Sequence, residues 1–312
     1  MEEFLYVEKY RPKTVSETIL PEKLKAVFQK FVDQKNVPNL ILSGRAGVGK
    51  TTIARAMLEE IGCDYMIING SLNAQIDRLR TDIANFASTT SFVGGRKYVI
   101  IDEADYMSAT HIQPALRNFI EEFSANCGFI MTCNFKNRII EPLHSRCSVI
   151  DFSIPKEEIP KLAACFWKRT CQILDKESVQ YDPKVVAEFI NSHFPDWRRC
   201  LNELQRYSSI GKIDSSILAV KSNDNIDVLI GYLKDKNFTD MRKWVSDNSD
   251  IDSAELYRKL YDVFPTKIKS TSSVSDAIII LAEYQYREAF VANTVINRVA
   301  CLSILMAEVD WK

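Results

Sequence analysis

The sequence predicts an α/β domain, with a parallel sheet flanked by helices, followed by a small helical domain and an all-helical C-terminal domain. Short apolar runs alternate with helix-compatible segments from Asn39 to Phe152, and strand signals stop after Ile154-Pro155. Apolar strands separated by helices are typical of parallel sheets that are covered on both faces. We therefore expect domains at residues 1–153, 154–221 and 222–312.

The apolar runs of the first domain are short enough to be buried strands. They are Leu40–Leu42, Tyr65–Ile68, Tyr98–Ile101, Phe129–Met131 and Val149–Ile150. The segments between them have helical spacing and are Thr51–Ile61, Ile76–Ser88, Ala109–Phe123 and Lys136–His144. This order predicts a repeated strand–helix unit.

The second and third domains contain helical patterns. Helices are expected at Ile159–Leu174, Pro183–His193 and Trp197–Ser209, with start signals at Asp182-Pro183 and Pro195-Asp196. The last block carries patterns at Ile226–Leu233, Asp240–Val245, Ala254–Phe264, Ser275–Val291 and Asn293–Val309. Apolar residues recur in its final helix at spacings of four and three: Val295, Val299, Leu302, Met306 and Val309. This spacing indicates a packing seam, which we interpret as a contact between subunits.

The composition is that of an ordinary globular protein. Lys and Arg number 40 against 41 Asp and Glu, for a formal charge of -1, so any DNA contact must come from a local patch. The start has no signal-peptide pattern, and the most apolar run, Ala277–Ala282, is too short to span a bilayer. Eight cysteines form no CxxC pair, which disfavours a zinc site and favours buried thiols. We expect a cytoplasmic protein without membrane attachment.

A glycine-rich loop between the first strand and the first helix predicts a nucleotide site. Residues 44–51 (GRAGVGKT) fit G-x-x-x-x-G-K-[ST], in which backbone N–H groups converge on phosphate oxygens. Lys50 can reach the β- and γ-phosphates, and the Thr51 hydroxyl can ligate Mg²⁺. The residues expected to contact ATP are Gly44, Arg45, Ala46, Gly47, Val48, Gly49, Lys50, Thr51 and Thr52.

An acidic pair follows the third strand about fifty residues later. Asp102 is expected to hold Mg²⁺ through water, and Glu103 to polarise the attacking water as general base. Two solvated loop carboxylates are the alternative. The nearby P-loop favours the catalytic interpretation.

Five motifs in order resemble the AAA+ sliding-clamp-loader family, which includes the small subunits of replication factor C. They are Val7–Pro12, the P-loop, Asp102–Asp105, Thr132-Cys133-Asn134 and Ser145-Arg146-Cys147. Residues 129–147 are especially similar to that family, and Asn85–Ser88 with the terminal Trp311-Lys312 resemble the large subunits of T-even bacteriophages. The resemblance implies an AAA+ core, a helical lid and a helical collar that mediates oligomerisation. The P-loop departs from it at Arg45-Ala46, where prolines are common.

The resemblance implies roles for further residues. Asn134 matches sensor 1, which orients the water, and Arg146 matches the arginine finger that acts in the neighbouring subunit's site. Arg198 matches sensor 2, and Tyr10 and Arg11 match the segment beside the adenine. The alternatives are a turn residue for Asn134, a surface ion pair for Arg146, a solvated side chain for Arg198 and core packing for Tyr10.

The resemblance also implies DNA and protein partners. In that family, helix N-termini follow the backbone of the DNA duplex and contact phosphates rather than bases. Arg80 is the position of this chain that best matches such a contact. Gln113 occupies the position that could link DNA contact to the ATP site. The partners implied are further copies of the chain, expected to be four, a distinct small subunit, the sliding clamp and primer–template DNA.

The function implied is ATP-driven loading of the clamp in DNA replication. One alternative is another AAA+ motor on DNA, such as a branch-migration helicase. The other is a scaffold subunit that binds nucleotide without hydrolysing it. The complete set Lys50, Thr51, Asp102, Glu103, Asn134 and Arg146 argues against a scaffold.

Overall fold

The computed structural model describes residues 4–71, 76–91, 94–209, 211–214, 217, 226–249, 251 and 253–312, without the side chains of 76–80 and 254–255. Its contacts divide the chain into two compact units, Met1–Asp214 and Ser215–Lys312. The first unit holds the nucleotide-binding loop and the helices that follow the sheet. The expected boundaries at residues 153 and 221 remain predictions.

The first unit is built around a parallel five-stranded sheet of order β2-β3-β4-β1-β5. The strands are β1 (Leu40–Ser43), β2 (Tyr65–Asn69), β3 (Lys97–Asp102), β4 (Cys127–Cys133) and β5 (Ser148–Asp151). In the register of the central strands, Leu40 lies opposite Ile130 on one side and Ser148 on the other. The prediction of a parallel sheet from five apolar runs is confirmed.

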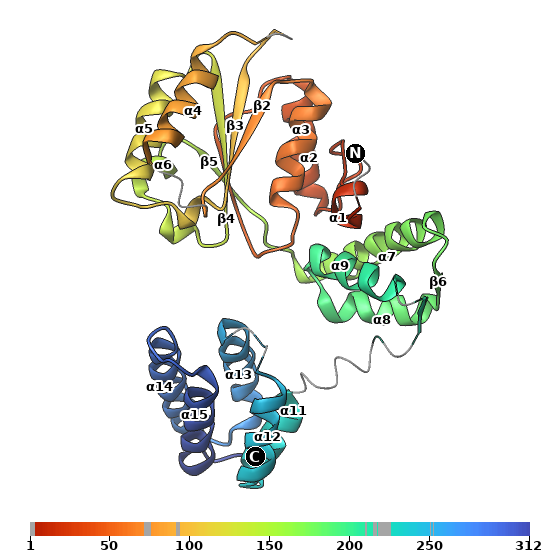
Figure 1. The fold of residues 1–312 in the computed structure, drawn as a ribbon, viewed down its shortest axis with the longest axis vertical. Helices are drawn as coiled ribbons and strands as arrows, with labels where there is room; N and C mark the ends of the chain where they lie inside the picture. The colour runs from red at the N-terminus through yellow and green to blue at the C-terminus, as the bar shows by residue number, and fades with distance from the viewer. Residues whose placement is uncertain are drawn as a thin grey trace. The chain divides into compact units, whose positions relative to one another are not determined.

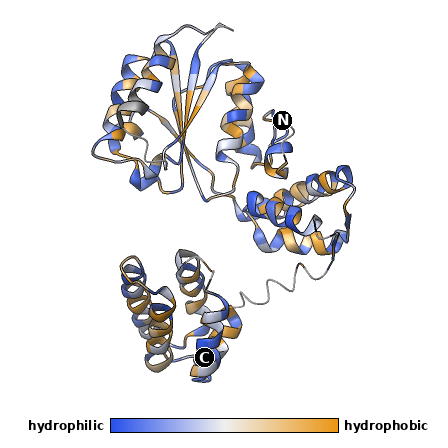
Figure 2. Ribbon diagram, in the orientation of Figure 1, coloured by the Kyte–Doolittle hydropathy of each residue, from blue (hydrophilic) through white to orange (hydrophobic). Residues whose placement is uncertain are grey.

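Helices cover both faces of this sheet (Figure 1). They are α2 (Glu22–Asp33) and α3 (Lys50–Ile61) on one face, and α4 (Ile76–Ser88) and α5 (Ile112–Glu122) on the other. Successive strand residues point to opposite faces, so Ile41 packs in one core cluster while Leu40 and Leu42 pack in the other. Figure 2 shows the strands as largely hydrophobic, whereas hydrophobic and hydrophilic residues alternate along the helices.

The structure corrects the expected helix over Lys136–His144. The segment contains a 3-10 turn, η2 (Lys136–Arg138), and a short helix, α6 (Glu141–His144), with extended backbone between them. The backbone N–H of Ile140 donates to the side-chain oxygen of Gln113 at 2.8 Å rather than to a helical carbonyl. A tertiary hydrogen bond therefore interrupts the helical pattern. Other elements had no sequence prediction, among them α1 (Tyr6–Lys9), α2 and the turn η1 (Ala104–Tyr106).

Three helices follow the sheet within the first unit. They are α7 (Ile159–Lys176), α8 (Pro183–His193) and α9 (Trp197–Ser208), preceded by the turn η3 (Lys156–Glu158). Asp182 and Asp196 cap α8 and α9 by accepting backbone N–H groups, as the start signals predicted. A two-stranded parallel pair, β6 (Gln180–Tyr181) with β7 (Lys212–Ile213), corrects the expectation that strands stop at residue 155. The pair is too short to leave an apolar alternation in the sequence.

The second unit is helical. Its described helices are α11 (Ile226–Lys234), α12 (Phe238–Asp247), α13 (Ser253–Lys267), α14 (Thr271–Glu288) and α15 (Thr294–Glu308). They enclose one apolar cluster that includes Leu229, Trp244, Phe264, Leu281 and Leu305. Across the residues that the structure covers, no helix combines the length and apolar character that a bilayer crossing requires.

The structure corrects the interpretation of the apolar seam in the last helix. Leu302, Met306 and Val309 are buried in the core of their own unit, and Val295 and Val299 pack against that core. The seam therefore packs within its own unit, and the apolar spacing by itself gives no evidence of a contact between subunits. The large apolar side chains that α14 and α15 expose are different ones: Ile279, Tyr286 and Ile296 are each more than 60% exposed.

A buried ion pair joins α14 to α15. Glu288 and Arg298 are 8% and 4% exposed, and Arg298 Nε donates to a Glu288 oxygen at 3.0 Å. Ser253 and Asn297 also donate to this carboxylate. Burial raises the pKa of Glu288, but these donors outweigh burial and the net pKa lies below its ordinary value. The carboxylate is therefore charged and fully hydrogen-bonded inside the bundle.

Candidate nucleotide site

The P-loop joins the carboxyl end of β1 to the amino end of α3, the position where a helix favours anions. Gly47 and Gly49 have φ values of 75° and 94°, which glycine adopts without strain. Val48 between them is 4% exposed and packs in the core beside Ile53 and Phe152. The loop is thus anchored at its centre while its flanking backbone stays available to phosphate.

Lys50 reaches across the loop toward the end of β4. Its ammonium donates to the backbone oxygens of Gly44 and Arg45 at 2.7 and 2.8 Å, and to Asn134 Oδ1 at 2.9 Å. Burial lowers the pKa of Lys50, although Asp102 and other neighbouring acidic groups act in the opposite direction. A partly desolvated ammonium gains strongly from an incoming anion. These contacts bring two predicted site residues together, Lys50 and Asn134.

Thr51 and Asp102 meet at the end of β3. The Thr51 hydroxyl donates to Asp102 Oδ1 at 2.6 Å, and the Thr132 hydroxyl donates to the same oxygen at 2.5 Å. Hard oxygen ligands of this kind suit Mg²⁺, so the two predicted metal residues fit the ion. Thr132 had no predicted role. Its only sequence signal was its place in the Thr132-Cys133-Asn134 motif, two residues before the sensor 1 position.

Glu103 follows Asp102 in the left-handed backbone region, with φ 57° and ψ 45°. Its backbone N–H donates to the Thr132 hydroxyl at 3.1 Å. A Cβ at Gly70 would lie 2.7 Å from the Glu103 carbonyl oxygen, so only glycine fits beside this turn. Strained backbone in a site is often part of its function, and here the hydrogen bond to Thr132 and the close approach of Gly70 hold the turn that carries the predicted general base.

Asp105 connects the acidic turn to the predicted sensor 1 residue. It is 5% exposed, and its Oδ2 accepts the backbone N–H groups of Asn134 and Phe135 at 3.1 and 3.0 Å. The loop after β4 is thereby tied to the loop after β3. Asp105 belonged to the quoted motif, but its supporting role depends on contacts about thirty residues apart in the chain.

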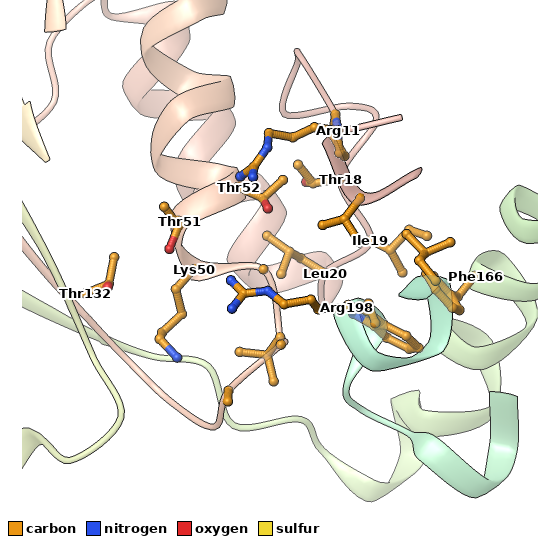
Figure 3. A pocket seen from close by; sticks show the side chains of 18 of the residues that line it. Arg11, Thr18, Ile19, Leu20, Lys50, Thr51, Thr52, Thr132, Phe166 and Arg198 are labelled. Atoms are coloured by element: carbon orange, nitrogen blue, oxygen red, sulfur yellow. The ribbon is translucent and has the colours of Figure 1, made fainter. Parts of the chain in front are cut away.

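A pocket opens beside the P-loop and extends toward the helices that follow the sheet (Figure 3). Its apolar lining comes from the N-terminal segment and from α7 and α9, and includes Val7, Ile19, Leu20, Phe166, Trp197 and Leu201. The Phe166 and Trp197 rings lie 4.3 Å apart. Such a lining next to a phosphate loop suits a flat heteroaromatic base. Neither Phe166 nor Trp197 had a predicted role in the site.

Tyr10, Arg11 and Arg198 all line this pocket. The Tyr10 hydroxyl donates to Glu177 in the region after α7, and the Arg11 side chain pairs with Glu8. Arg198 extends from α9 toward the P-loop and Lys50 (Figure 3). The structure thus groups these residues with the phosphate loop, while their roles toward a nucleotide remain predictions.

The N-terminal segment is fastened to the helices beyond the sheet. Arg169 of α7 donates to the Tyr10 carbonyl at 2.9 Å and to the Glu17 carbonyl at 3.3 Å. Gln205 of α9 accepts the Tyr6 N–H at 2.9 Å. The base side of the pocket is therefore formed by two segments held together by long-range hydrogen bonds. Arg169 had no predicted role.

Arg146 lies away from the residues described so far. It precedes β5, whose first residue, Ser148, pairs with Leu40 at the start of β1. The P-loop follows the other end of β1. Four residues of strand span about 13 Å, so Arg146 stands at the opposite end of the strands from its own P-loop. Its guanidinium pairs with Glu121 near the end of α5, and its Nη1 donates to the Pro142 carbonyl at 2.9 Å.

Gln113 is buried rather than a surface residue, at 1% exposure. Its amide nitrogen donates to the Met107 and Arg138 carbonyls, each at 3.0 Å, and its oxygen accepts the Ile140 N–H. It thereby connects the loops that follow β3 and β4, and its hydrogen bonds are internal. The Arg80 side chain lies outside the described residues, so the predicted DNA contact there remains a prediction.

Taken together, the sheet order, the P-loop, the acidic turn and the helices over the pocket define a P-loop ATPase of the AAA+ class. The family model described as "ATPase family associated with various cellular activities (AAA)" matches residues 40–154. The model described as "Sliding-clamp-loader large subunit, AAA+ ATPase lid domain" matches residues 164–219. The chain is accordingly an ATPase with a nucleotide site.

Relatives extend over the full length. The sliding-clamp-loader large subunit of Enterobacteria phage T4 is 35% identical over 99% of this chain and 98% of its own, and that of Escherichia phage RB69 is 34% identical over the same shares. The replication factor C small subunit of Archaeoglobus fulgidus is 35% identical over 68% of this chain and 67% of its own. The chain belongs to the sliding-clamp-loader large-subunit family.

Solved structures give a more distant likeness. A RuvB variant from Thermotoga maritima has a TM-score of 0.53 at 19% identity, covering 81% of this chain and 79% of its own. The RuvB Holliday junction branch migration motor of the same organism has a TM-score of 0.51 at 17% identity, covering 81% and 78%. Identities this low show the fold alone, so the alternative of a branch-migration helicase is not favoured.

Proposed function

We propose that this chain uses ATP and Mg²⁺ to load a sliding clamp onto primer–template DNA, with each ATPase site completed by a neighbouring subunit. The observation that carries the proposal is the position of Arg146. An arginine at the end of the strands opposite to the P-loop cannot reach its own nucleotide, but it can enter the site of a subunit packed against that end. Membership in the clamp-loader family supports the same arrangement.

Within one subunit, the residues around the P-loop have distinct tasks. Lys50 binds the β- and γ-phosphates, and Thr51 and Asp102 hold Mg²⁺, which neutralises phosphate charge. Glu103 takes a proton from the attacking water, and Asn134 orients that water from the end of β4. Arg198 contacts the same nucleotide from α9, so that ATP holds this helix against the core.

The base and ribose occupy the apolar side of the pocket. Tyr10 and Arg11 border it from the N-terminal segment, and Trp197 and Phe166 border it from α9 and α7. Because this lining comes from both sides of the pocket, a bound nucleotide holds the two together. The P-loop residues from Gly44 to Thr52 contribute backbone N–H groups to the phosphates.

Arg146 supplies positive charge to a reaction in the next subunit. Hydrolysis develops negative charge on the transferred phosphoryl group, and a guanidinium from outside stabilises it. Hydrolysis then depends on how subunits are arranged, which is how clamp and DNA can control it. An isolated chain is accordingly expected to hydrolyse ATP slowly.

The second unit is proposed to hold the complex together. The apolar side chains exposed on α14, on α15 and between them include Ile279, Tyr286, Phe290 and Ile296, and the last three lie within eleven residues of chain at the helix junction. Exposed apolar groups in such a cluster suit an interface between subunits. The complex is proposed to contain four copies of this chain and one distinct small subunit.

DNA contact is proposed at the start of α4, through Arg80, with primer–template DNA read by its phosphates. Gln113 is proposed to relay that contact to the ATP site by holding the loops after β3 and β4 in one relative position. If ATPase activity stays fully DNA-stimulated in Gln113→Ala, Gln113 has no such role.

The test is steady-state ATPase activity of the chain assembled with its small subunit. Clamp and primer–template DNA are added separately and then together. We expect clamp and DNA together to stimulate the ATPase rate much more than either does alone. In Arg146→Ala the stimulated rate should fall by about a thousandfold or more, while ATP affinity is retained. Arg206→Ala is the matched control, because Arg206 is an exposed arginine paired with Glu203 on α9. Activity indifferent to clamp and DNA would contradict the proposal.

A further inference from the structure

We propose that Glu121 is a positioning residue for the arginine finger: it holds the Arg146 guanidinium in the orientation that serves the neighbouring ATPase site. The inference rests on the proposed function, in which Arg146 acts between subunits. It concerns a residue that no motif in the sequence marks.

Glu121 engages one edge of the guanidinium. Both Nε and Nη2 of Arg146 donate to the same Glu121 oxygen, the Nε bond being 2.7 Å long. The remaining nitrogen, Nη1, donates to the Pro142 carbonyl at 2.9 Å and to the Ser145 hydroxyl at 3.2 Å. All three nitrogens of the finger are thus held by its own subunit, and these contacts together fix the plane of the guanidinium.

The supports come from rigid elements. Glu121 lies on α5, the helix whose first turn is held to the loops after β3 and β4 by Gln113. Pro142 and Ser145 belong to α6 and its end, which pack against α5. An arginine on one loop would sample many rotamers, and fixing it on binding costs conformational entropy. An arginine held by two helices meets its target already oriented.

The exposure of this ion pair suits a role at an interface between subunits better than a role in stabilising the fold. The side chains of Arg146 and Glu121 are 32% and 55% exposed. Exposed ion pairs contribute little to folding, whereas this pair stands at the end of the sheet that faces a neighbour under the proposed function. Nη2 carries two N–H groups, and Glu121 accepts only one of them. The other N–H can therefore point outward to phosphate while the carboxylate stays bound.

Glu122 provides a matched control. It is the next residue of α5, is exposed, and has the same charge. Replacing either glutamate with alanine changes the net charge and helix propensity equally, so a difference between the two variants reports the contact with Arg146. Glu121→Gln keeps an acceptor for the guanidinium but removes the charge, and should restore part of the lost function.

The experiment measures ATPase kinetics of the assembled complex with clamp and primer–template DNA. We expect Glu121→Ala to lower kcat about tenfold to a hundredfold with KM for ATP unchanged, and Glu122→Ala to match wild type. Glu121→Gln should fall between them. Thermal unfolding of each variant chain is expected to match wild type, which separates positioning from misfolding.

A double variant tests whether Glu121 acts through Arg146. In the Arg146→Ala background, Glu121→Ala should have no further effect on kcat, because the residue it positions is gone. An additional loss there would overturn the inference, as would a Glu121→Ala variant equal to Glu122→Ala. A rise in kcat would also overturn it, because Glu121 would then restrain the finger instead of aiming it.

The variants distinguish a failure of the proposed function of Arg146 from a failure of the positioning role of Glu121. Full stimulated activity in Arg146→Ala would remove the interfacial arginine from the proposed function, and this inference with it. Loss of activity in Arg146→Ala together with a silent Glu121→Ala would remove only the positioning role.

Discussion

Replacing Gly47 with alanine would test whether the P-loop and α9 bind the nucleotide as one unit. Gly47 has a φ of 75°, and a Cβ there would lie 1.9 Å from Asp196 Oδ1. Asp196 caps α9 by accepting the Arg199 N–H at 2.9 Å, and the next residue, Trp197, donates its N–H to the Gly47 carbonyl at 3.3 Å. The methyl group therefore cannot be accommodated without moving the start of α9 or the loop.

The size of the effect follows from two costs. A non-glycine residue in the left-handed region costs about 1–2 kcal/mol, and displacing Asp196 from its cap costs about 1 kcal/mol. An empty loop can relieve this strain by moving, whereas bound triphosphate holds the loop in place, so the cost appears in binding. A total of about 2–3 kcal/mol weakens ATP affinity by about 30- to 140-fold.

Equilibrium binding of a fluorescent ATP analogue in the presence of Mg²⁺ measures this effect. Gly49→Ala is the matched control, because Gly49 is also left-handed, at φ 94°, but has nothing within 4 Å of the added Cβ. It should show the backbone cost alone, about 5- to 30-fold. Combining Gly47→Ala with Asp196→Ala removes the nearest clashing atoms and should reduce the penalty of the Gly47 substitution.

Two results would refute this reasoning. If Gly47→Ala and Gly49→Ala bind ATP equally, contact with α9 adds nothing to the cost. If Gly47→Ala causes the same loss with and without Asp196, the two positions are not coupled, since contacting residues should show non-additive effects.

Further predictions concern the acidic turn and the second unit. Thr132→Val removes the hydroxyl that donates a hydrogen bond to Asp102 and should slow single-turnover hydrolysis about tenfold to a hundredfold. Thr132→Ser should hydrolyse ATP at nearly the wild-type rate, and equal rates for the two variants would contradict the role of this hydroxyl. Glu288→Ala leaves Arg298 buried and unpaired and should lower the unfolding free energy of the second unit by about 3–5 kcal/mol, measured by chemical denaturation, while half-exposed Glu283→Ala should change it little. Because the folded-state pKa of Glu288 lies below its ordinary value, its stabilisation is complete above the unfolded-state pKa and is lost as the pH falls through the folded pKa; a Glu288→Gln variant with the same acid sensitivity in thermal unfolding would contradict this assignment.

Contiguous motifs were predictable because their chemistry depends on neighbours in the chain. The P-loop from Gly44 to Thr51 needs only glycines at fixed spacing between a strand and a helix, and Asp102-Glu103 needs only the end of an apolar strand. The capped helix starts at Asp182 and Asp196 are local for the same reason. The sheet followed as well, since parallel strands buried on both faces have few polar residues.

Supporting contacts depended on the tertiary structure. Thr132 meets Asp102 thirty positions away, and Lys50 meets Asn134 across 84 positions. Tyr6 meets Gln205 across 199 positions, which places the N-terminal segment over the pocket. No periodicity in the sequence encodes such pairs, because side chains this far apart become neighbours only after the strands have ordered.

The sequence by itself determined the class of chemistry, through short motifs whose spacing matches phosphate, magnesium and water. It could not determine which surface a regular pattern would bury: the apolar seam of α15 packs inside its own unit, although its spacing equally suits a contact between subunits. Only the tertiary structure decided that question, and only the parallel pairing of β5 with β1 showed that Arg146 and the P-loop lie at opposite ends of the strands. The physical reason is that helical spacing specifies an apolar face but not its partner, whereas the direction and register of paired strands specify which chain segments lie at the same end of a sheet.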